Sequence, residues 1–439
     1  MKNVPGKWSV FVIILLGLLV VFGSSSDSKV PAKDKNIYKE IKTFNEVLDM
    51  VQKNYVDAVD PSVLIQGAIN GMIKSLDPHS AFMTPDIYKE LEVETQGRFG
   101  GIGIEITILK DVLTVVSPIE DTPAFNAGVK SGDQIVKIDG KSTKDITILE
   151  AVKKLRGPKD TKVTITIMRE NMTQPRDITL TRAIIQVKSV KAKTVDDHIG
   201  YIRIASFHER TAADLRKAWS EVSEKSKPVK GLVLDLRNDP GGLLNQAIEV
   251  SDMFLRSGII VSTRGRTKNM ETKTMARDNG EQEISVPLVV LVNEGTASAA
   301  EIVAGALQDN GRALIIGTQT FGKASVQTVI PLENGSALKL TTARYYTPNG
   351  RSIQAEGIKP DIVVRLVRPA DEKEDRFEER VREKDLKGHI KPAKEDGTQL
   401  EENKTESLKE ATDLDKDNQL KAAVDILKSW QIMKKNPVN

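Results

Sequence analysis

One short segment of the sequence places a serine where acyl-transfer chemistry is feasible. Ser298 lies in segment 296–301 (Thr-Ala-Ser-Ala-Ala-Glu), after an apolar run and before a helical pattern. A strand-to-helix turn holds a side chain at a fixed point, and it directs free N–H groups and the helix dipole there. A serine in that place can attack a carbonyl while the N–H groups stabilise the oxyanion. Taken alone, the segment is better explained by a serine that caps the helix.

A lysine lies on a loop bordered by glycines. Segment 317–323 (Gly-Thr-Gln-Thr-Phe-Gly-Lys) nearly spells a phosphate-binding loop. That motif needs Ser or Thr directly after the lysine and a helix beyond it. Here Ala324 follows Lys323, and residues 326–330 read as a strand. The segment therefore meets neither requirement for nucleotide binding. It leaves open why a lysine lies between two apolar segments.

A third segment, 235–242 (Asp-Leu-Arg-Asn-Asp-Pro-Gly-Gly), reads as a strand that ends in a turn. Glycine lets the backbone approach a ligand closely, so the N–H of Gly241 is a candidate oxyanion donor. An ordinary turn between a strand and a helix is the alternative. A Ser–His–Asp triad would need one of the four histidines, which we expect in loops or at the surface: His79, His198, His208 and His389.

Composition excludes several classes of protein. With 64 basic and 61 acidic residues the net charge is +3, and aromatic residues make up 4% of the chain. Neither value favours nucleic-acid binding. The chain has no cysteine, which excludes disulfides, thiolate nucleophiles and metal sites built on cysteine.

The elements that must position these residues follow from hydrophobic patterning. From residue 199 onward, apolar strands alternate with helices, which predicts a layered α/β core. Residues 97–185 instead show short β-rich runs with turn signals and one helix, at 148–155. The predicted strands of the core are 199–206, 232–236, 286–292 and 337–346, and its predicted helices are 211–225, 243–255 and 299–308.

Both ends of the chain differ from this pattern. Lys2 and Lys7 precede an apolar run over 8–22, and small residues follow, which is typical of a signal peptide. An uncleaved anchor is the alternative, and in either case we expect the rest of the chain outside the cytoplasm. Residues 35–75 predict an amphipathic helical pair. The charged stretch 370–412 is expected to be largely solvated, and a helical stripe follows from Leu420.

Together the three segments resemble the carboxyl-terminal processing proteases, also called tail-specific proteases, over about residues 40–365. The order Ser298, Lys323, Gln327 without a histidine is the most specific part. One departure is Ala324, where the family usually has glycine, and a positive φ there would strain alanine. Further stretches agree: 76–80 (Leu-Asp-Pro-His-Ser), 344–354, 357–361, and a PDZ-like pattern at 100–104 with Pro123-Ala124, Ala127-Gly128 and Gly132-Asp133.

The resemblance implies a multidomain α/β protein. It has a ClpP/crotonase-like α/β protease core, an inserted β-rich PDZ domain, and helical N- and C-terminal segments. The predicted boundaries are 1–26 for a signal peptide or membrane anchor, 27–96 for an N-terminal helical region, 97–185 for the PDZ domain, 186–368 for the α/β serine protease core, and 369–439 for a charged, partly helical C-terminal region.

The resemblance also implies a serine endopeptidase. Ser298 is expected to attack the scissile carbonyl, and a neutral Lys323 to take its proton. Gln327 is expected to orient the lysine, and the N–H groups of Ala299 and Gly241 to form the oxyanion hole. No metal or organic cofactor is called for.

The PDZ domain is expected to bind the C-terminus of a substrate as an added strand. We assign the carboxylate-binding loop to Gly100, Gly101, Ile102, Gly103 and Ile104. Arg156 is expected to sense that carboxylate or to hold the PDZ domain in one position, and a solvated arginine is the alternative. A bound tail could then shift the PDZ domain and complete the active site.

The family suggests proteins with apolar C-termini as substrates, in a bacterial periplasm or cell envelope. Some members work through an adaptor protein. The terminal helical stripes fit either pairing of protomers or packing on their own core. Two rival functions are a non-catalytic PDZ scaffold on a degenerate core, which the full set of Ser298, Lys323 and Gln327 disfavours, and a crotonase-like coenzyme A enzyme, which has no use for a PDZ domain.

Overall fold

The structure is a computed structural model that describes residues 32–109, 111–169, 172–196, 198–225, 227–277, 284–367, 382–386, 388–390 and 417–435. The chain divides into two compact units, one up to Met72 and one from Ile73 onward. The first holds α2 (Ala32–Asn54) and most of α3 (Pro61–Lys74), which confirms the predicted helical pair. None of the described helices is both long enough and apolar enough to cross a membrane. The predicted signal peptide or anchor at 1–26 lies outside the described residues.

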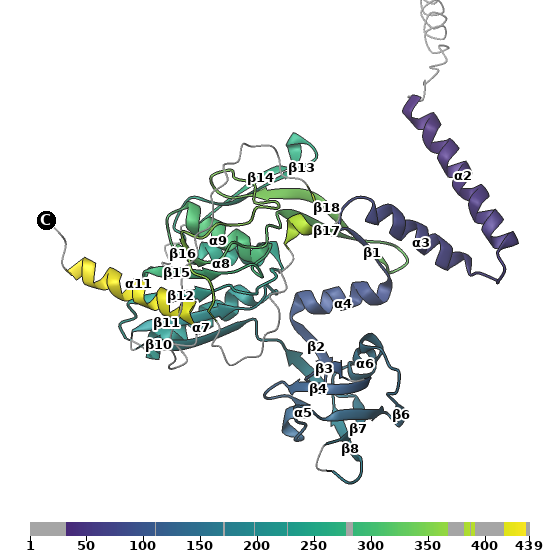
Figure 1. Ribbon diagram of the computed structural model, residues 1–439, viewed down its shortest axis with the longest axis horizontal. Coiled ribbons are helices and arrows are strands. Elements are labelled where there is room, and N and C mark those ends of the chain that lie inside the picture. The colour runs from purple at the N-terminus through teal and green to yellow at the C-terminus, as the bar shows by residue number, and fades with distance from the viewer. Residues whose placement is uncertain are drawn as a thin grey trace, which may run out of the picture. The chain divides into compact units, whose positions relative to one another are not determined.

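A six-stranded sheet forms the centre of the second unit (Figure 1). Its strand order is β10-β11-β12-β15-β16-β19, and all neighbours are parallel except the edge pair β10 and β11. The strands are β10 (Val190–Asp196), β11 (Ile199–Ile204), β12 (Gly231–Asp235), β15 (Leu288–Val292), β16 (Leu314–Gly317) and β19 (Ile362–Val363).

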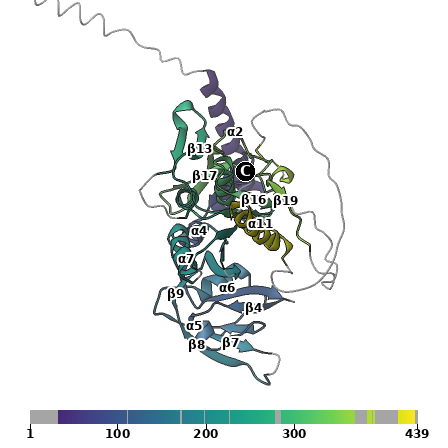
Figure 2. The same cartoon turned by 90° about the vertical axis from the view of Figure 1, so that its left-hand side faces the viewer.

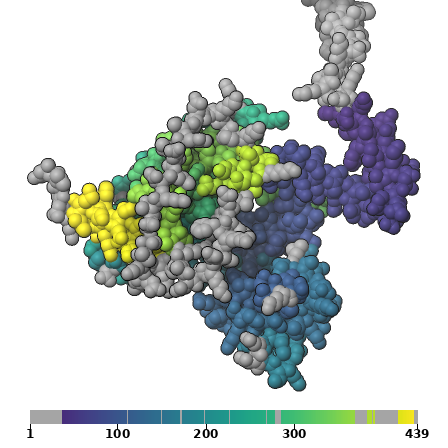
Figure 3. Space-filling view, viewed as in Figure 1, coloured from purple at the N-terminus to yellow at the C-terminus, as the bar shows by residue number. Residues whose placement is uncertain are grey.

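Helices cover both faces of this sheet, which explains why its strands read as continuous apolar runs. Every residue of β12 and β15 is buried. Because side chains alternate along a strand, Leu234 and Val290 pack in the core with α8 and α9, while Val233 and Leu291 pack against α11. Figure 3 shows α11 (yellow) at the surface of this body. The helices are α7 (Thr211–Lys225), α8 (Leu244–Asp252), α9 (Ala299–Asp309) and α11 (Asn418–Lys435).

A second, antiparallel sheet carries the loop that contains Lys323. Its strand order is β1-β18-β13-β14, and β17 also pairs with β18. The register of β17 and β18 is shifted between Val326 and Gln327. The strands are β1 (Ala81–Met83), β13 (Ile259–Gly265), β14 (Glu271–Met275), β17 (Ser325–Pro331) and β18 (Ala337–Tyr346).

A β-rich domain is inserted ahead of the α/β core (Figure 2). Its sheet order is β3-β4-β5-β7-β8, with β6 paired to β5, and its interior is apolar. The predicted helix at 148–155 is confirmed as α6, which begins with a capping box formed by Thr147 and Glu150. The strands are β3 (Ile104–Leu109), β4 (Val112–Pro118), β5 (Gln134–Ile138), β6 (Lys141–Ser142), β7 (Lys162–Met168) and β8 (Arg176–Thr181), and the helices are α5 (Pro123–Asn126) and α6 (Ile148–Leu155).

Candidate active site

Three turns meet at one edge of the parallel sheet. β12, β15 and β16 are neighbours in parallel register, and each ends at this edge. Segment 238–242 follows β12, Ser298 follows β15, and segment 318–324 follows β16. The carboxyl ends of parallel strands are where α/β proteins bind ligands. The fold therefore brings together the three segments that the sequence singled out.

Ser298 occupies a strained turn directly before α9. Its backbone has φ 54° and ψ −114°, a conformation that a residue with a side chain rarely adopts. Such strain persists only where the surroundings fix it, and it is concentrated at functional sites. The side chain is half-buried. The turn thus presents the hydroxyl at the sheet edge instead of folding it into the core.

Gly241 lies directly against this turn. A Cβ atom at Gly241 would come within 2.8 Å of both Ser298 Cβ and the Ala299 nitrogen, and its φ is 94°. Both facts require glycine. The Ala297 N–H also donates to the carbonyl oxygen of Asp239 at 2.9 Å, which ties the two turns together. The structure therefore brings Ser298 and both predicted oxyanion donors to one place.

The N–H of Gly241 already has an acceptor in this structure. It donates to Oδ1 of Asp239 at 2.8 Å, while Asp239 Oδ2 is buried and has no partner among the described residues. Burial raises the pKa of Asp239 to about 8. Ala299 is the first residue of α9, where an N–H has no intrahelical acceptor. Before Gly241 can stabilise an oxyanion, its N–H must leave Asp239.

Lys323 lies in a half-buried environment that suits a base. Burial lowers the pKa of Lys323, and the charge of Lys339 lowers it further. The carboxylates of Glu383, Glu301 and Asp77 act in the opposite direction. Within the described part of the chain, no hydrogen bond joins the Lys323 side chain to Ser298. Burial thus lets the Lys323 amine become neutral at a lower pH than an exposed lysine would.

Glu301 connects the serine turn to the lysine loop. Its fully buried carboxylate accepts hydrogen bonds from the N–H groups of Ser298 (2.9 Å), Gly322 (2.8 Å) and Lys323 (3.0 Å), and from the Thr320 hydroxyl. Burial raises the pKa of Glu301 to about 7, although these donors act to lower it. Glu301 is not among the site residues expected from the sequence, although a Ser followed by Glu at the third position is a capping-box pattern that could have indicated it.

Tyr345 adds a second connection between the same two segments. This buried residue of β18 places its hydroxyl against the carbonyl oxygens of both Ser298 (3.0 Å) and Lys323. Glu301 thus bonds to the backbone N–H groups of Ser298 and Lys323, and Tyr345 bonds to their backbone carbonyl oxygens. The backbones of Ser298 and Lys323 are fixed relative to each other at both sides.

The hydrogen bonds of Gln327 go to residues other than Lys323, the residue that the family resemblance expects it to orient. Its Nε2 donates to the hydroxyls of Ser325 (2.8 Å) and Thr341 (3.4 Å). Thr341 in turn donates to Asp77, in the Leu-Asp-Pro-His-Ser segment, at 3.2 Å. The register shift next to Gln327 and the position of Thr341 on β18 turn the amide toward this network. Neither feature is visible in the sequence.

The alanine that departs from the family pattern is not strained. The backbone at Ala324 has no positive φ, whereas Gly322 has φ 97°. The Ala324 N–H donates to Oε1 of Gln354 at 2.9 Å, and the side chain is buried. The glycine that the loop requires is therefore Gly322.

None of the four histidines hydrogen bonds to Ser298, and all four are described. Nε2 of His208 contacts the Ser206 hydroxyl at 3.0 Å, and Nε2 of His79 contacts Glu383 at 2.8 Å. The described residues contain no group of three or more His, Asp or Glu arranged to hold a metal ion. Lys323 is therefore the base candidate that the fold brings to the same sheet edge as Ser298.

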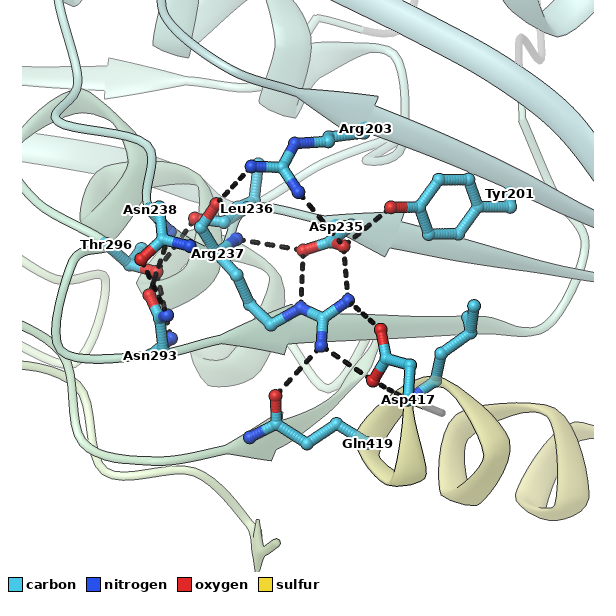
Figure 4. Close-up of polar contacts among 11 residues, drawn as sticks. Tyr201, Arg203, Asp235, Leu236, Arg237, Asn238, Asn293, Thr296, Asp417 and Gln419 are labelled. Carbon is cyan, nitrogen blue, oxygen red and sulfur yellow. Dashed lines mark hydrogen bonds and ion pairs between the residues drawn. The ribbon is translucent and has the colours of Figure 1, made fainter. Parts of the chain in front are cut away.

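A buried ionic network supports the turn that carries Gly241 (Figure 4). The guanidinium of Arg237 donates to both oxygens of Asp235, to both oxygens of Asp417 and to Oε1 of Gln419, at 2.7–3.0 Å. Tyr201 donates to Asp235 from β11 at 2.7 Å. Since Asp417 directly precedes α11 and Gln419 lies in its first turn, the network joins the C-terminal helix to the residues just before the turn that carries Gly241.

The predicted carboxylate-binding loop of the PDZ domain is divided among three elements. Gly100–Gly101 lies in β2 (Arg98–Gly101) and pairs with β9 (Ala183–Gln186). Ile102 and Gly103 form the loop proper, and Ile104 is the first residue of β3. Gly103 has φ 78°, and a Cβ there would come within 2.3 Å of Thr122. The geometry requires glycine at 103.

Arg156 is paired instead of solvated. Its guanidinium contacts Glu90 of α4 (Pro85–Gln96) and lies 4.3 Å from the ring centroid of Phe99. One turn earlier on α6, Lys153 contacts Asp86 of α4 at 2.6 Å. Both contacts join the PDZ helix α6 to α4, which precedes the PDZ domain in the chain.

Comparison with known proteins decides the family. The profile of peptidase family S41 matches residues 198–364, a PDZ domain profile matches 100–180, and the profile of the activating protease CtpB N-terminal domain matches 22–87. The chain is 48% identical over 385 residues to a carboxy-terminal-processing protease of Bartonella bacilliformis, covering 87% of each chain. The chain belongs to the carboxy-terminal processing protease family.

A second relative agrees with this assignment. The carboxy-terminal processing protease CtpA of Bacillus subtilis is 37% identical over 82% of this chain and 74% of its own. A solved photosystem II D1 C-terminal processing protease is 32% identical and covers 73% of this chain and 92% of its own, with a TM-score of 0.45. The predicted family, the multidomain α/β fold and the peptidase activity are confirmed. Peptidase activity sets aside the scaffold and coenzyme A alternatives.

Proposed function

We propose that this carboxy-terminal processing protease is a serine endopeptidase with Ser298 as nucleophile and Lys323 as general base. The observation that carries the proposal is the pair of connections through Glu301 and Tyr345, which hold both backbones at one site. The burial that lowers the pKa of Lys323 supports the same roles, because the base must be neutral.

The catalytic steps follow from these positions. Lys323 accepts the hydroxyl proton as Ser298 Oγ forms a bond to the scissile carbonyl carbon. The oxyanion is stabilised by the N–H groups of Ala299 and Gly241, once Gly241 has left Asp239. The Lys323 ammonium then protonates the leaving amine, which departs and leaves an acyl-enzyme. Water attacks the ester carbonyl carbon while Lys323 takes one of its protons. Lys323 then returns this proton to Ser298 Oγ as the C–Oγ bond breaks and the carboxyl product leaves.

Gln327 is a positioning residue in this scheme. Its hydrogen bonds to Ser325 and Thr341 fix the start of β17, which begins two residues after Lys323. We infer that it orients the lysine through the backbone of β17 and not by direct contact.

Substrate choice is assigned to the PDZ domain. We infer that it captures apolar C-terminal tails, with the carboxylate at Ile102 and Gly103, because PDZ domains bind such tails as an added strand. The pairing of Arg156 with Glu90 supports a role in holding the domain against α4. The signal-like pattern before residue 27 favours export, and so proteins of the bacterial cell envelope as substrates.

Proteolysis of an unstructured protein that ends in apolar residues tests the proposal. Wild type should cleave it, and Ser298→Ala and Lys323→Ala should each reduce cleavage by more than about a thousandfold. The exposed Ser220→Ala and Lys359→Ala variants are matched controls and should keep wild-type rates. Cleavage by Lys323→Ala at a rate near wild type would refute the assignment of the base.

A further inference from the structure

A short segment from the C-terminal region packs against the lysine loop. Residues 382–386 lie within a stretch that the sequence analysis expected to be largely solvated. The structure corrects this for one side chain, because Glu383 in the 3-10 turn η2 (Glu383–Asp385) has 0% exposure. In Figure 1 this turn is the short yellow-green ribbon next to β17. A buried carboxylate needs partners, and these partners show what the segment does.

The partners of Glu383 lie on both sides of Lys323. Its N–H donates to the carbonyl oxygen of Phe321 at 3.4 Å. Its Oε1 accepts from Nε2 of Gln354 at 3.0 Å, and Oε1 of Gln354 accepts the Ala324 N–H at 2.9 Å. One residue therefore reaches the loop before and after the lysine.

Glu383 also contacts the segment that precedes β1. Both of its carboxylate oxygens lie 2.8 Å from Nε2 of His79. Asp77 and Ser80 of the same segment bond to Thr341, the residue that accepts from Gln327. Glu383 thus joins three segments that are far apart in sequence, and all three border the lysine.

We propose that Glu383, carried on η2, is a positioning residue for Lys323. The proposal rests on the proposed role of Lys323 as general base. It gives the C-terminal region a catalytic purpose that no feature of its sequence suggests.

The charge of Glu383 should affect a second measurable quantity besides the cleavage rate, namely the pKa of Lys323. Four charged groups act on the Lys323 amine: Lys339 from β18, Glu301 from α9, Asp77 from the segment before β1, and Glu383. The carboxylate of Glu383 favours the ammonium form and so raises the pKa of Lys323. Removing that charge should lower the pKa, and the amine becomes neutral at lower pH.

The experiment is a pH profile of kcat/KM for the full chain. Glu383→Gln keeps the shape of the side chain, and His79 can change tautomer to keep its hydrogen bond. We expect the rising limb of the profile to move to lower pH by about one unit. Asp385→Asn is the matched control, because Asp385 lies in the same turn but is exposed. Its profile should coincide with that of wild type.

A second measurement does not depend on activity. In the Ser298→Ala background, the rate at which an amine-reactive acylating reagent modifies Lys323 is measured as a function of pH. This rate reports the pKa of Lys323 directly, and Glu383→Gln should shift that pKa to a lower value. Unshifted profiles in both experiments, or equal shifts for Asp385→Asn, would overturn the proposal. If instead Lys323→Ala still cleaves while the acylation shift is present, the proposed base is wrong and the electrostatic effect of Glu383 on Lys323 stands.

Discussion

The protease core and the PDZ domain bury carboxylates in different ways. In the PDZ domain, Asp133 is fully buried and is paired with Arg169 at 2.6 Å. Burial acts to raise the pKa of Asp133, but the bonds from Arg169 and the Lys130 N–H hold it below its usual value. In the core, Asp239 and Glu301 are just as buried, but backbone N–H groups and one hydroxyl are their partners, and both pKa values are raised.

The two kinds of buried carboxylate have different roles: the one paired with arginine stabilises the fold, and those bonded to neutral donors hold the candidate active site. A carboxylate paired with arginine contributes stability near neutral pH. A carboxyl bonded only to neutral donors is costly to ionise in the interior. Among the described residues of the core, Asp239 and Glu301 are of this kind, and they hold the backbone of Ser298, Lys323 and Gly241, the proposed nucleophile, base and oxyanion donor. Unpaired buried acids are therefore a mark of the active site in this molecule.

The largest effect is expected at Glu301. Glu301→Gln offers one acceptor oxygen and turns an NH₂ group toward the N–H donors of Ser298, Gly322 and Lys323. Buried donors without acceptors cost about 1–3 kcal/mol each. We expect cleavage to fall by more than about a hundredfold and urea unfolding to show a loss of about 3 kcal/mol.

The exposed Glu221→Gln on α7 is the matched control and should change neither quantity. If Glu301→Gln keeps wild-type activity and stability, Glu301 is not the connection between the two catalytic segments.

Asp239 should make the protein less stable as the pH rises. Its folded pKa of about 8 lies above the usual 3.8, so the folded state keeps a proton that the unfolded state has lost. The stabilising contribution is complete below about pH 4 and is lost as the pH rises through 8, at up to about 1.4 kcal/mol per pH unit. Unfolding of Asp239→Asn, measured from pH 5 to 9, should lack this slope. A slope equal to that of wild type would show that Asp239 is not the group responsible.

Asp133 should show the opposite pH dependence. Because its folded pKa is lowered, its contribution is present above the unfolded pKa and is lost as the pH falls through the folded pKa. Asp133→Asn should cost about 2 kcal/mol at pH 7, and this cost should shrink as the pH falls below about 4. The exposed Asp160→Asn in the same domain is the control. A loss for Asp133→Asn that persists in acid would argue for packing instead of charge.

The smallest effect is expected at the contact between α6 and α4. Arg156 and Glu90 are each about 30% exposed (27% and 32%), so their coupling in a double-mutant cycle should be about 1 kcal/mol or less and should weaken in high salt. A much larger, salt-independent coupling would mean that this contact resembles the buried pairs and not a surface pair.

The sequence predicted most of the fold and part of the site. Continuous apolar runs identified β12 and β15 because both faces of that sheet are covered. Ser298 and Lys323 were identified by their segments. Gln327 was expected at the lysine, but a register shift turns it toward Thr341. Glu383 could not be found, since its burial depends on docking of a charged segment onto a distant loop.

The most direct test of the account is acylation of the enzyme by a slowly hydrolysed peptide ester, followed by mass spectrometry across a pH series. We expect an adduct on Ser298. Its rate of formation should rise with pH, with an apparent pKa below the usual 10.5 of lysine. The Lys323→Ala variant should form this adduct at least about a hundredfold more slowly. An adduct on another residue, or equal rates in wild type and Lys323→Ala, would contradict the central claim that Ser298 and Lys323 act as nucleophile and base.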